Sequence, residues 1–163
     1  MTTRGPIDFQ ANLRNWLAQS FSWSSARVPF LQAVSGISNA DCYLKPSGAP
    51  YSIWELTEHI RIAQKDILDY CKNPHYQSPE CPAEYWPEKD KAPTNRQWED
   101  CIELYKNDLR EMSCIILNPS NDLFKPFDNG SGHNLFREAA ILIDHTAYHT
   151  GQIILIRKLL GWW

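Results

Sequence analysis

The chain has 163 residues, of which 43% are hydrophobic and 21% charged, a composition typical of one globular domain, which we expect to span residues 1–163. Its formal net charge of -3 argues against binding to nucleic acid or to an anionic membrane, because both attract basic surfaces. With no apolar run near the roughly 18 residues of a membrane-spanning helix and no signal-peptide pattern, we expect a cytoplasmic protein whose five cysteines are free thiols.

The first helical pattern extends from about Ile7 to Val34 and is interrupted in the middle. Ser22 to Ser25 and Pro29 break the apolar spacing, and proline inside a helix removes a backbone hydrogen bond and clashes with the preceding turn. This segment is therefore expected to form either a kinked helix or two short helices.

The second predicted helix has the clearest start. Ser52 followed by Glu55 is a capping box, in which each side chain accepts a hydrogen bond from the other residue's backbone N–H. Apolar residues then recur every three or four positions as far as Tyr70, which is the spacing of one helix face. The pair Asn73-Pro74 ends this helix.

Two further helices complete the pattern. The third begins with another capping box at Thr94 and stops before Asn118, and the fourth runs from about Asn134 to Leu160, with Gly161 as its stop signal. No segment shows the alternation of a β-strand. Four helices that each bury one face predict an all-α fold, a four-helix bundle.

The connection from Asn73 to Pro93 is unusually long for a bundle and is rich in proline. In an extended conformation it could run the full length of a helix, so the second and third helices could lie parallel. Its three large aromatic residues, Tyr76, Tyr85 and Trp86, favour a crossover that packs against the bundle over a loose surface loop.

Two histidines in the fourth helix have the spacing of a metal-binding pair. His145 and His149 are four residues apart, so their side chains point the same way, and they lie at the polar centre of a stripe whose ends are apolar. A metal ion would satisfy both imidazoles if the stripe is buried. The alternatives are hydrogen bonds to backbone carbonyls or carboxylates, or a stripe that lines a wet cleft.

His59 offers a third ligand, because it lies next to Ile60 on the expected buried side of the second helix. Three neutral imidazoles with one open position are typical of a catalytic zinc-like site. His75 and His133 are interpreted as surface residues. The sequence contains no E-x-x-H and no H-E-x-x-H motif, which excludes the ferritin-like di-iron arrangement and the common metalloprotease helix.

Four stretches resemble the DinB-like (YfiT-related) superfamily, which is distinct from the DNA polymerase of the same name. Their order, spacing and motifs agree from the first helix to Gly161. These stretches are SIWELTEHIRIAQ (52–64), YWP (85–87), DHTAYHTGQ (144–152) and LLGW (159–162).

The resemblance implies an up-down-down-up bundle and a divalent metal ion, nickel or zinc, held by His59, His145 and His149. It also implies a small-molecule substrate. Characterised relatives are thiol-dependent transferases and isomerases that activate a low-molecular-weight thiol at the metal, others are called hydrolases, and several form homodimers. Nucleic acid and membrane are not expected as partners.

Two hypotheses about function follow. In the first, the protein is a metal-dependent enzyme that activates a water or thiol, and Glu55, Glu138 and Gln152 are candidates for orienting the imidazoles or contacting substrate. Each has a simpler interpretation: Glu55 as a helix cap, Glu138 as a solvated charge and Gln152 as a hydrogen bond across the bundle. In the second, the ion only braces a non-catalytic bundle that acts in stress response or protein interaction.

Overall fold

The computed structural model describes residues 8–128 and 131–163, and over these residues it contains helices and no strand. The all-α prediction is confirmed. The described residues form four long helices and two short ones: α1 (Phe9–Ser20), α2 (Phe30–Val34), α3 (Ile53–Lys72), η1 (Ala83–Tyr85), α4 (Asn95–Leu117) and α5 (Leu135–Leu159).

The predicted break in the first segment separates two helices, α1 and α2. Asp8 caps α1 through its side chain, which accepts from the backbone of Ala11, and Pro29 is the N-cap residue of α2. The start predicted at Ile7 lies outside the described residues.

Both predicted capping boxes are confirmed. Ser52 Oγ accepts from the Glu55 backbone N–H at 3.1 Å, and Glu55 Oε2 accepts from the Ser52 backbone N–H at 2.7 Å. Thr94 and Gln97 form the same pair of bonds at the start of α4. These bonds satisfy N–H groups that have no partner within a helix, and so they fix where α3 and α4 begin.

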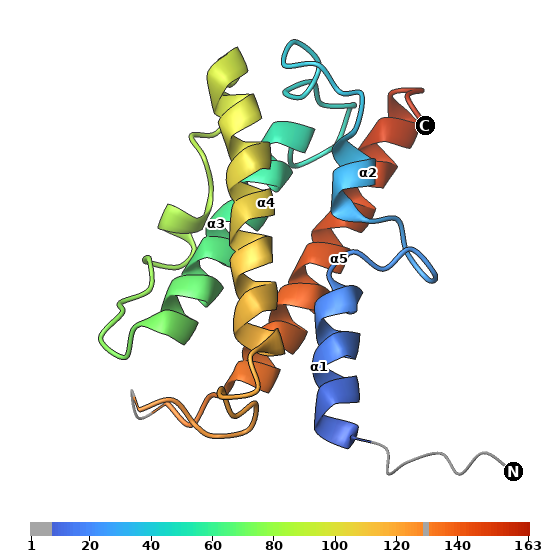
Figure 1. Ribbon diagram of the computed structural model, residues 1–163. Coiled ribbons are helices and arrows are strands. Elements are labelled where there is room, and N and C mark those ends of the chain that lie inside the picture. Colours follow the sequence, from blue (N-terminus) through green and yellow to red (C-terminus); the bar gives the residue numbers. More distant parts are fainter. Residues whose placement is uncertain (1–7, 129–130) are drawn as a thin grey trace, which may run out of the picture.

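The long helices form an up-down-down-up bundle (Figure 1), as predicted: α1 and α5 run in one direction, and α3 and α4 run in the other. The parallel arrangement of α3 and α4 requires the long crossover between them. This segment runs beside α3, which η1 contacts.

The buried apolar side chains form two clusters along the bundle. One cluster, with Phe30, Ile60 and Ile153 in it, lies where α2 packs on the bundle. The other, which includes Leu17 and Leu142, joins α1 to the C-terminal part of α3 and the N-terminal part of α5. Polar residues of α3 and α5 occur between these apolar groups, and they include the histidines described below.

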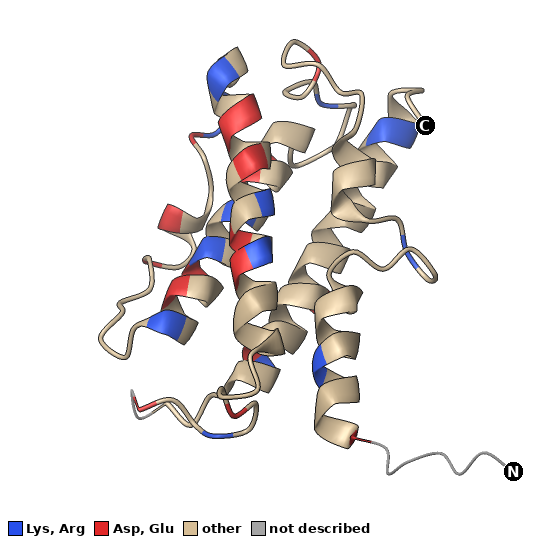
Figure 2. Cartoon of the chain, viewed as in Figure 1, with Lys and Arg blue, Asp and Glu red and all other residues tan. Residues whose placement is uncertain are grey.

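Charged side chains are concentrated on α3 and α4, where both signs alternate (Figure 2), and the middle of α5 carries few. None of the helices in the described part of the chain is both long enough and apolar enough to cross a membrane.

Candidate metal centre

Three histidines from two helices meet at one point between α3 and α5. His59 Nε2 lies 3.2 Å from His149 Nε2 and 3.0 Å from His145 Nε2. A set of ring nitrogens, one from each histidine, lies within 4.8 Å of one another. The structure thus brings together the three histidines that the sequence suggested as metal ligands.

The outward nitrogens of two of these rings are held by oxygen acceptors. His59 Nδ1 is 2.7 Å from the backbone carbonyl of Tyr85, and His149 Nδ1 is 2.7 Å from the amide oxygen of Gln152. Because both oxygens only accept hydrogen bonds, each Nδ1 carries the hydrogen, and in the neutral ring the lone pair is on Nε2. His59 and His149 therefore direct lone pairs toward each other.

Burial favours the neutral form of all three rings. Desolvation lowers the pKa of His59 and outweighs the opposing effect of the Tyr85 carbonyl. The pKa of His149 is lowered mainly by burial as well, against the hydrogen bond to Gln152. For His145, burial and the two neighbouring imidazoles lower the pKa to about 4. Near neutral pH, protonation of these rings does not relieve the repulsion between the facing lone pairs.

A divalent cation fits this donor set. Zinc–nitrogen bonds of about 2.0–2.1 Å at tetrahedral angles would place two nitrogens roughly 3.3 Å apart, close to the separations found here. Among the described residues, no cysteine, aspartate or glutamate joins the three histidines as a further ligand. Three neutral ligands without a fourth leave one coordination position for an exogenous group.

The crossover between α3 and α4 covers one side of this centre. The Trp86 ring stacks on the His59 ring, with centroids 3.9 Å apart and an interplanar angle of 0°, and it also stacks on Tyr51 at 4.3 Å. Together with the Tyr85 carbonyl, these contacts fix the orientation of His59. The prediction that the aromatic crossover packs against the bundle is therefore confirmed for Tyr85 and Trp86.

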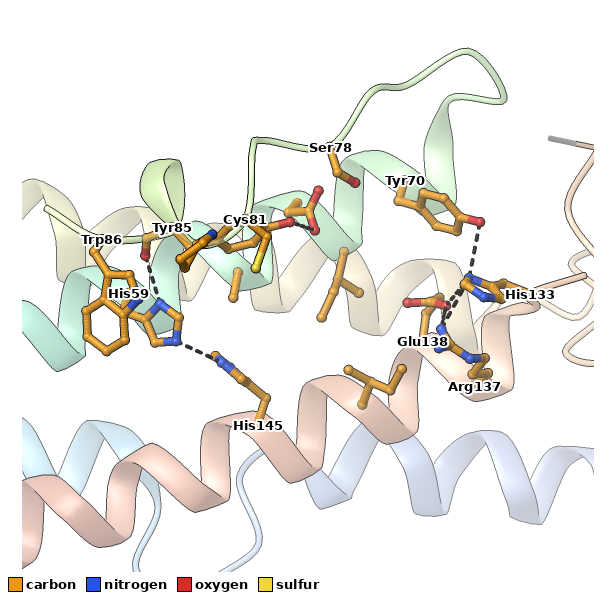
Figure 3. Close-up of a pocket in the computed structure, with 15 residues that line it drawn as sticks. His59, Tyr70, Ser78, Cys81, Tyr85, Trp86, His133, Arg137, Glu138 and His145 are labelled. Carbon is orange, nitrogen blue, oxygen red and sulfur yellow. Dashed lines mark hydrogen bonds and ion pairs between the residues drawn. The ribbon is translucent and has the colours of Figure 1, made fainter. Parts of the chain in front are cut away.

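A cavity of about 400 Å³ opens beside the histidines. His59 and His145 line one end of it, and its walls come from α3, α5 and the crossover (Figure 3). The volume is in the usual range for a small-molecule site. A group bound next to the histidines would lie inside this cavity.

The sequence matches the family model of the DinB superfamily over residues 22–153. The chain belongs to the DinB superfamily. The matched range contains α2 to α4 and most of α5, including all three histidines. No curated protein matches the sequence.

In this DinB-superfamily protein, the three residues proposed to orient the imidazoles have different roles. Gln152 bonds to His149 directly. Glu55 does not bond to His59, although it lies one turn away, because its carboxylate is engaged by Ser52, Lys45 and the backbone of Asp90.

Glu138 likewise makes no bond to His145. It is buried, and its Oε1 lies 2.5 Å from Arg137 Nη1 and 3.4 Å from His133 Nδ1. The interpretation of Glu138 as a solvated charge is wrong because its side chain is only 6% exposed. His133, interpreted as a surface residue, lines the same cavity as Glu138.

Sequence reasoning missed several groups at the site. The carbonyl of Tyr85 and the ring of Trp86 hold His59, and Tyr70 and Arg137 line the far end of the cavity. A backbone carbonyl has no signature in the sequence, because every residue carries one. Tyr70 could have been singled out, since it lies on the same face of α3 as His59, eleven residues or about three turns later.

Proposed function

We propose that His59, His145 and His149 bind one divalent metal ion, nickel or zinc, and that this DinB-superfamily protein is a metal-dependent enzyme. The observation that carries the proposal is the 3.2 Å separation between the Nε2 atoms of His59 and His149, whose Nδ1 hydrogens are directed outward, with His145 Nε2 3.0 Å from His59 Nε2. A bound cation turns this repulsive arrangement of lone pairs into a favourable one.

The cavity supports an enzyme rather than a metal that only braces two helices. A bracing site is closed by four protein ligands, whereas a catalytic site keeps a position for water or substrate. Here three histidines are grouped and a cavity adjoins two of them. A divalent cation held by neutral imidazoles lowers the pKa of a water or thiol bound to it, which supplies a nucleophile near neutral pH.

The protein's own residues would orient and shield the reacting groups. The Tyr85 carbonyl and Gln152 fix two ring orientations, a role that typically contributes about 10- to 100-fold in metal affinity. Trp86 covers one face of His59 and keeps water from that side. By resemblance to the family, the nucleophile we favour is a low-molecular-weight thiol, in a transferase or isomerase; the second candidate is water, in a hydrolase.

Metal analysis tests the site. Protein reconstituted with zinc or nickel and freed of excess ion should contain about one ion per chain, and His59→Ala, His145→Ala and His149→Ala should each lose it, because two ligands hold an ion far more weakly than three. His75→Ala is the matched control, since this histidine is exposed in the crossover. Unchanged metal content in all three variants would falsify the site.

The cobalt-substituted protein separates an enzyme from a brace. Addition of a small thiol should change the visible spectrum and produce a sulfur-to-cobalt charge-transfer band, because the thiol takes the open position. Azide should also change the spectrum if the position is open to any small anion. A spectrum that neither addition alters would assign the ion to a closed, bracing site.

A further inference from the structure

The cavity beside the histidines is elongated and has a second polar end. Along α3 it is lined in turn by His59, Ala63, Ile67 and Tyr70, and α5 runs antiparallel to α3 on the opposite side, with lining residues from His145 back to Arg137. Glu138 and His145 are seven positions apart, which corresponds to roughly 10 Å along the helix. An extended ligand of about this length would reach from one end to the other.

Apolar side chains from both helices line the middle of the cavity. Ala63 and Ile67 face it from α3, Ile141 faces it from α5, and Pro82 of the crossover also lines it. This stretch suits a hydrocarbon chain rather than a polar or phosphorylated one. Asp66, Ser78 and Cys81 also line the cavity, but Asp66 is engaged by the Tyr85 hydroxyl, so the charged group with free donors lies at the Arg137 end.

The far end is built around Arg137 (Figure 3). Its Nη1 donates to Glu138 Oε1 at 2.5 Å and to His133 Nδ1 at 3.2 Å. The Tyr70 hydroxyl donates to Ser131 Oγ and lies 3.2 Å from His133 Nδ1. Glu138 is buried and holds the guanidinium against the cavity wall.

One edge of this guanidinium remains available. Among the described residues, Nε and Nη2 of Arg137 have no hydrogen-bond partner, and the side chain is 46% exposed. Nε and Nη2 carry two parallel N–H donors, the geometry that binds a carboxylate with two hydrogen bonds.

Each acidic residue of the cavity has one carboxylate oxygen engaged by a protein donor. Glu138 is paired with Arg137. Asp66 accepts from the Tyr85 hydroxyl through Oδ2 at 2.7 Å, and its Oδ1 is covered by protein atoms. The charges of Arg137 and Glu138 offset each other, and the free edge of Arg137 presents two parallel donors, which favours a carboxylate at this end of a ligand.

We propose that the cavity binds an elongated small molecule whose reactive end lies at the three histidines and whose other end is a carboxylate bound by Arg137. Glu138 positions the guanidinium, and Tyr70 and His133 adjoin the carboxylate. The assignment of the reactive end rests on the proposed metal-dependent function. The assignment of the carboxylate end rests on the geometry around Arg137 and can be tested without the metal.

The first experiment compares thiols of one length in zinc-loaded protein by calorimetry. Mercaptohexanoate should bind about tenfold more tightly than mercaptohexanol, because only the carboxylate can take two bonds from Arg137. Mercaptoacetate, which is too short to reach Arg137, should show no such advantage over mercaptoethanol. Equal binding of the two long thiols, or tighter binding of aminohexanethiol than of mercaptohexanoate, would overturn the carboxylate assignment.

Substitution of Arg137 and Glu138 tests whether these residues cause the tighter binding of mercaptohexanoate. Arg137→Gln/Glu138→Gln removes both charges and leaves no unpaired buried carboxylate, so it is preferred to Arg137→Gln alone. The double variant should keep its metal and its affinity for mercaptohexanol while losing the tenfold advantage of mercaptohexanoate. Arg96→Gln is the matched control because Arg96 is exposed on α4. Retention of the advantage in the double variant would contradict the proposal.

A third experiment tests the carboxylate site independently of the proposed chemistry at the metal. Heptanoate and heptanol lack a thiol and can be titrated into the metal-free protein by NMR. Heptanoate should bind more tightly than heptanol, and the double variant should abolish the difference. If no thiol binds at the metal but this difference is found, the thiol chemistry fails and the carboxylate site stands; if the difference is missing, the carboxylate site fails whatever the thiols do.

Discussion

Two buried polar clusters lie one turn apart on α3, and they differ in whether their hydrogen bonds are complete. The Glu55 carboxylate receives bonds from the backbone and hydroxyl of Ser52, from the backbone of Asp90 and from Lys45. In the histidine cluster, His59 and His149 direct lone pairs at each other, and His145 Nδ1 has no partner among the described residues.

The comparison shows how to distinguish a structural polar cluster from a functional one. Burial alone does not separate them, since Glu55, His59 and His149 are all less than 9% exposed. The difference lies in what each cluster lacks. A cluster whose donors and acceptors match stabilises the fold by itself, whereas one whose lone pairs face each other lacks a cation. If this is correct, substitutions in the two clusters should have opposite effects on the metal-free protein.

The largest effect is expected at the Glu55 cluster, whose hydrogen bonds are complete. Glu55→Ala should lower the free energy of unfolding by about 2–3 kcal/mol, because it removes a helix cap and several hydrogen bonds to a buried charge. Metal content should stay at the level of the wild type. Urea denaturation of the metal-free protein measures the first quantity, and elemental analysis measures the second.

Glu103→Ala provides the control, because Glu103 is exposed on α4 and its ion pairs with Lys106 and Arg110 are at the surface. It should change stability by less than about 0.5 kcal/mol. A loss below about 1 kcal/mol for Glu55→Ala, or a loss of metal in that variant, would break the comparison at the Glu55 cluster.

The two clusters also differ in how far they could be predicted. The capping box of Glu55 is local, within four residues, and the helical spacing of His145 and His149 is local too, so both could be found in the sequence. The contacts of Glu55 with Lys45 and Asp90 come from flanking loops, and their geometry depends on how those loops pack. The sequence therefore predicts the cap but not the complete cluster.

The arrangement of the bundle could likewise be predicted further from the sequence than the candidate site could. The long, proline-rich crossover allows parallel α3 and α4, because a long extended segment is needed to join them, and the resemblance to the DinB-like superfamily implies this topology. The cavity depends on the side-by-side packing of α3 and α5, which brings Tyr70 next to His133 across 63 residues of sequence. Its polar end at Arg137 has no local pattern, and so it could be found only in the structure.

A substitution in the histidine cluster should instead raise the stability of the metal-free protein. His145→Leu is expected to stabilise the metal-free protein by about 1 kcal/mol, because it replaces a buried ring that has an unpartnered nitrogen by an apolar side chain. With metal present, the wild type should gain about 2.7 kcal/mol when the free ion is at 100 times its dissociation constant, and the variant should gain nothing.

Thermal or urea unfolding with and without a chelator measures both changes for His145→Leu. His75→Leu is the matched control, because His75 is exposed and its replacement should have little effect in either condition. A clear destabilisation of metal-free His145→Leu would mean that the three rings satisfy one another and need no ion.

The smallest expected effect is the pH dependence of the stability that the Glu55 cluster contributes. Burial by itself would raise the pKa of Glu55, but the backbone N–H groups of Ser52 and Asp90, together with Lys45, outweigh it and lower the pKa below the usual 4.5. A carboxylate whose pKa is lower in the folded than in the unfolded state stabilises the fold above its unfolded pKa, and this contribution is lost as the pH falls through the folded value. The stability difference between the wild type and Glu55→Gln should therefore be constant from pH 7 to about 5 and shrink at more acidic pH. Urea midpoints across this range measure it, and a difference that grows on acidification would mean that burial, rather than the hydrogen bonds, controls this carboxylate.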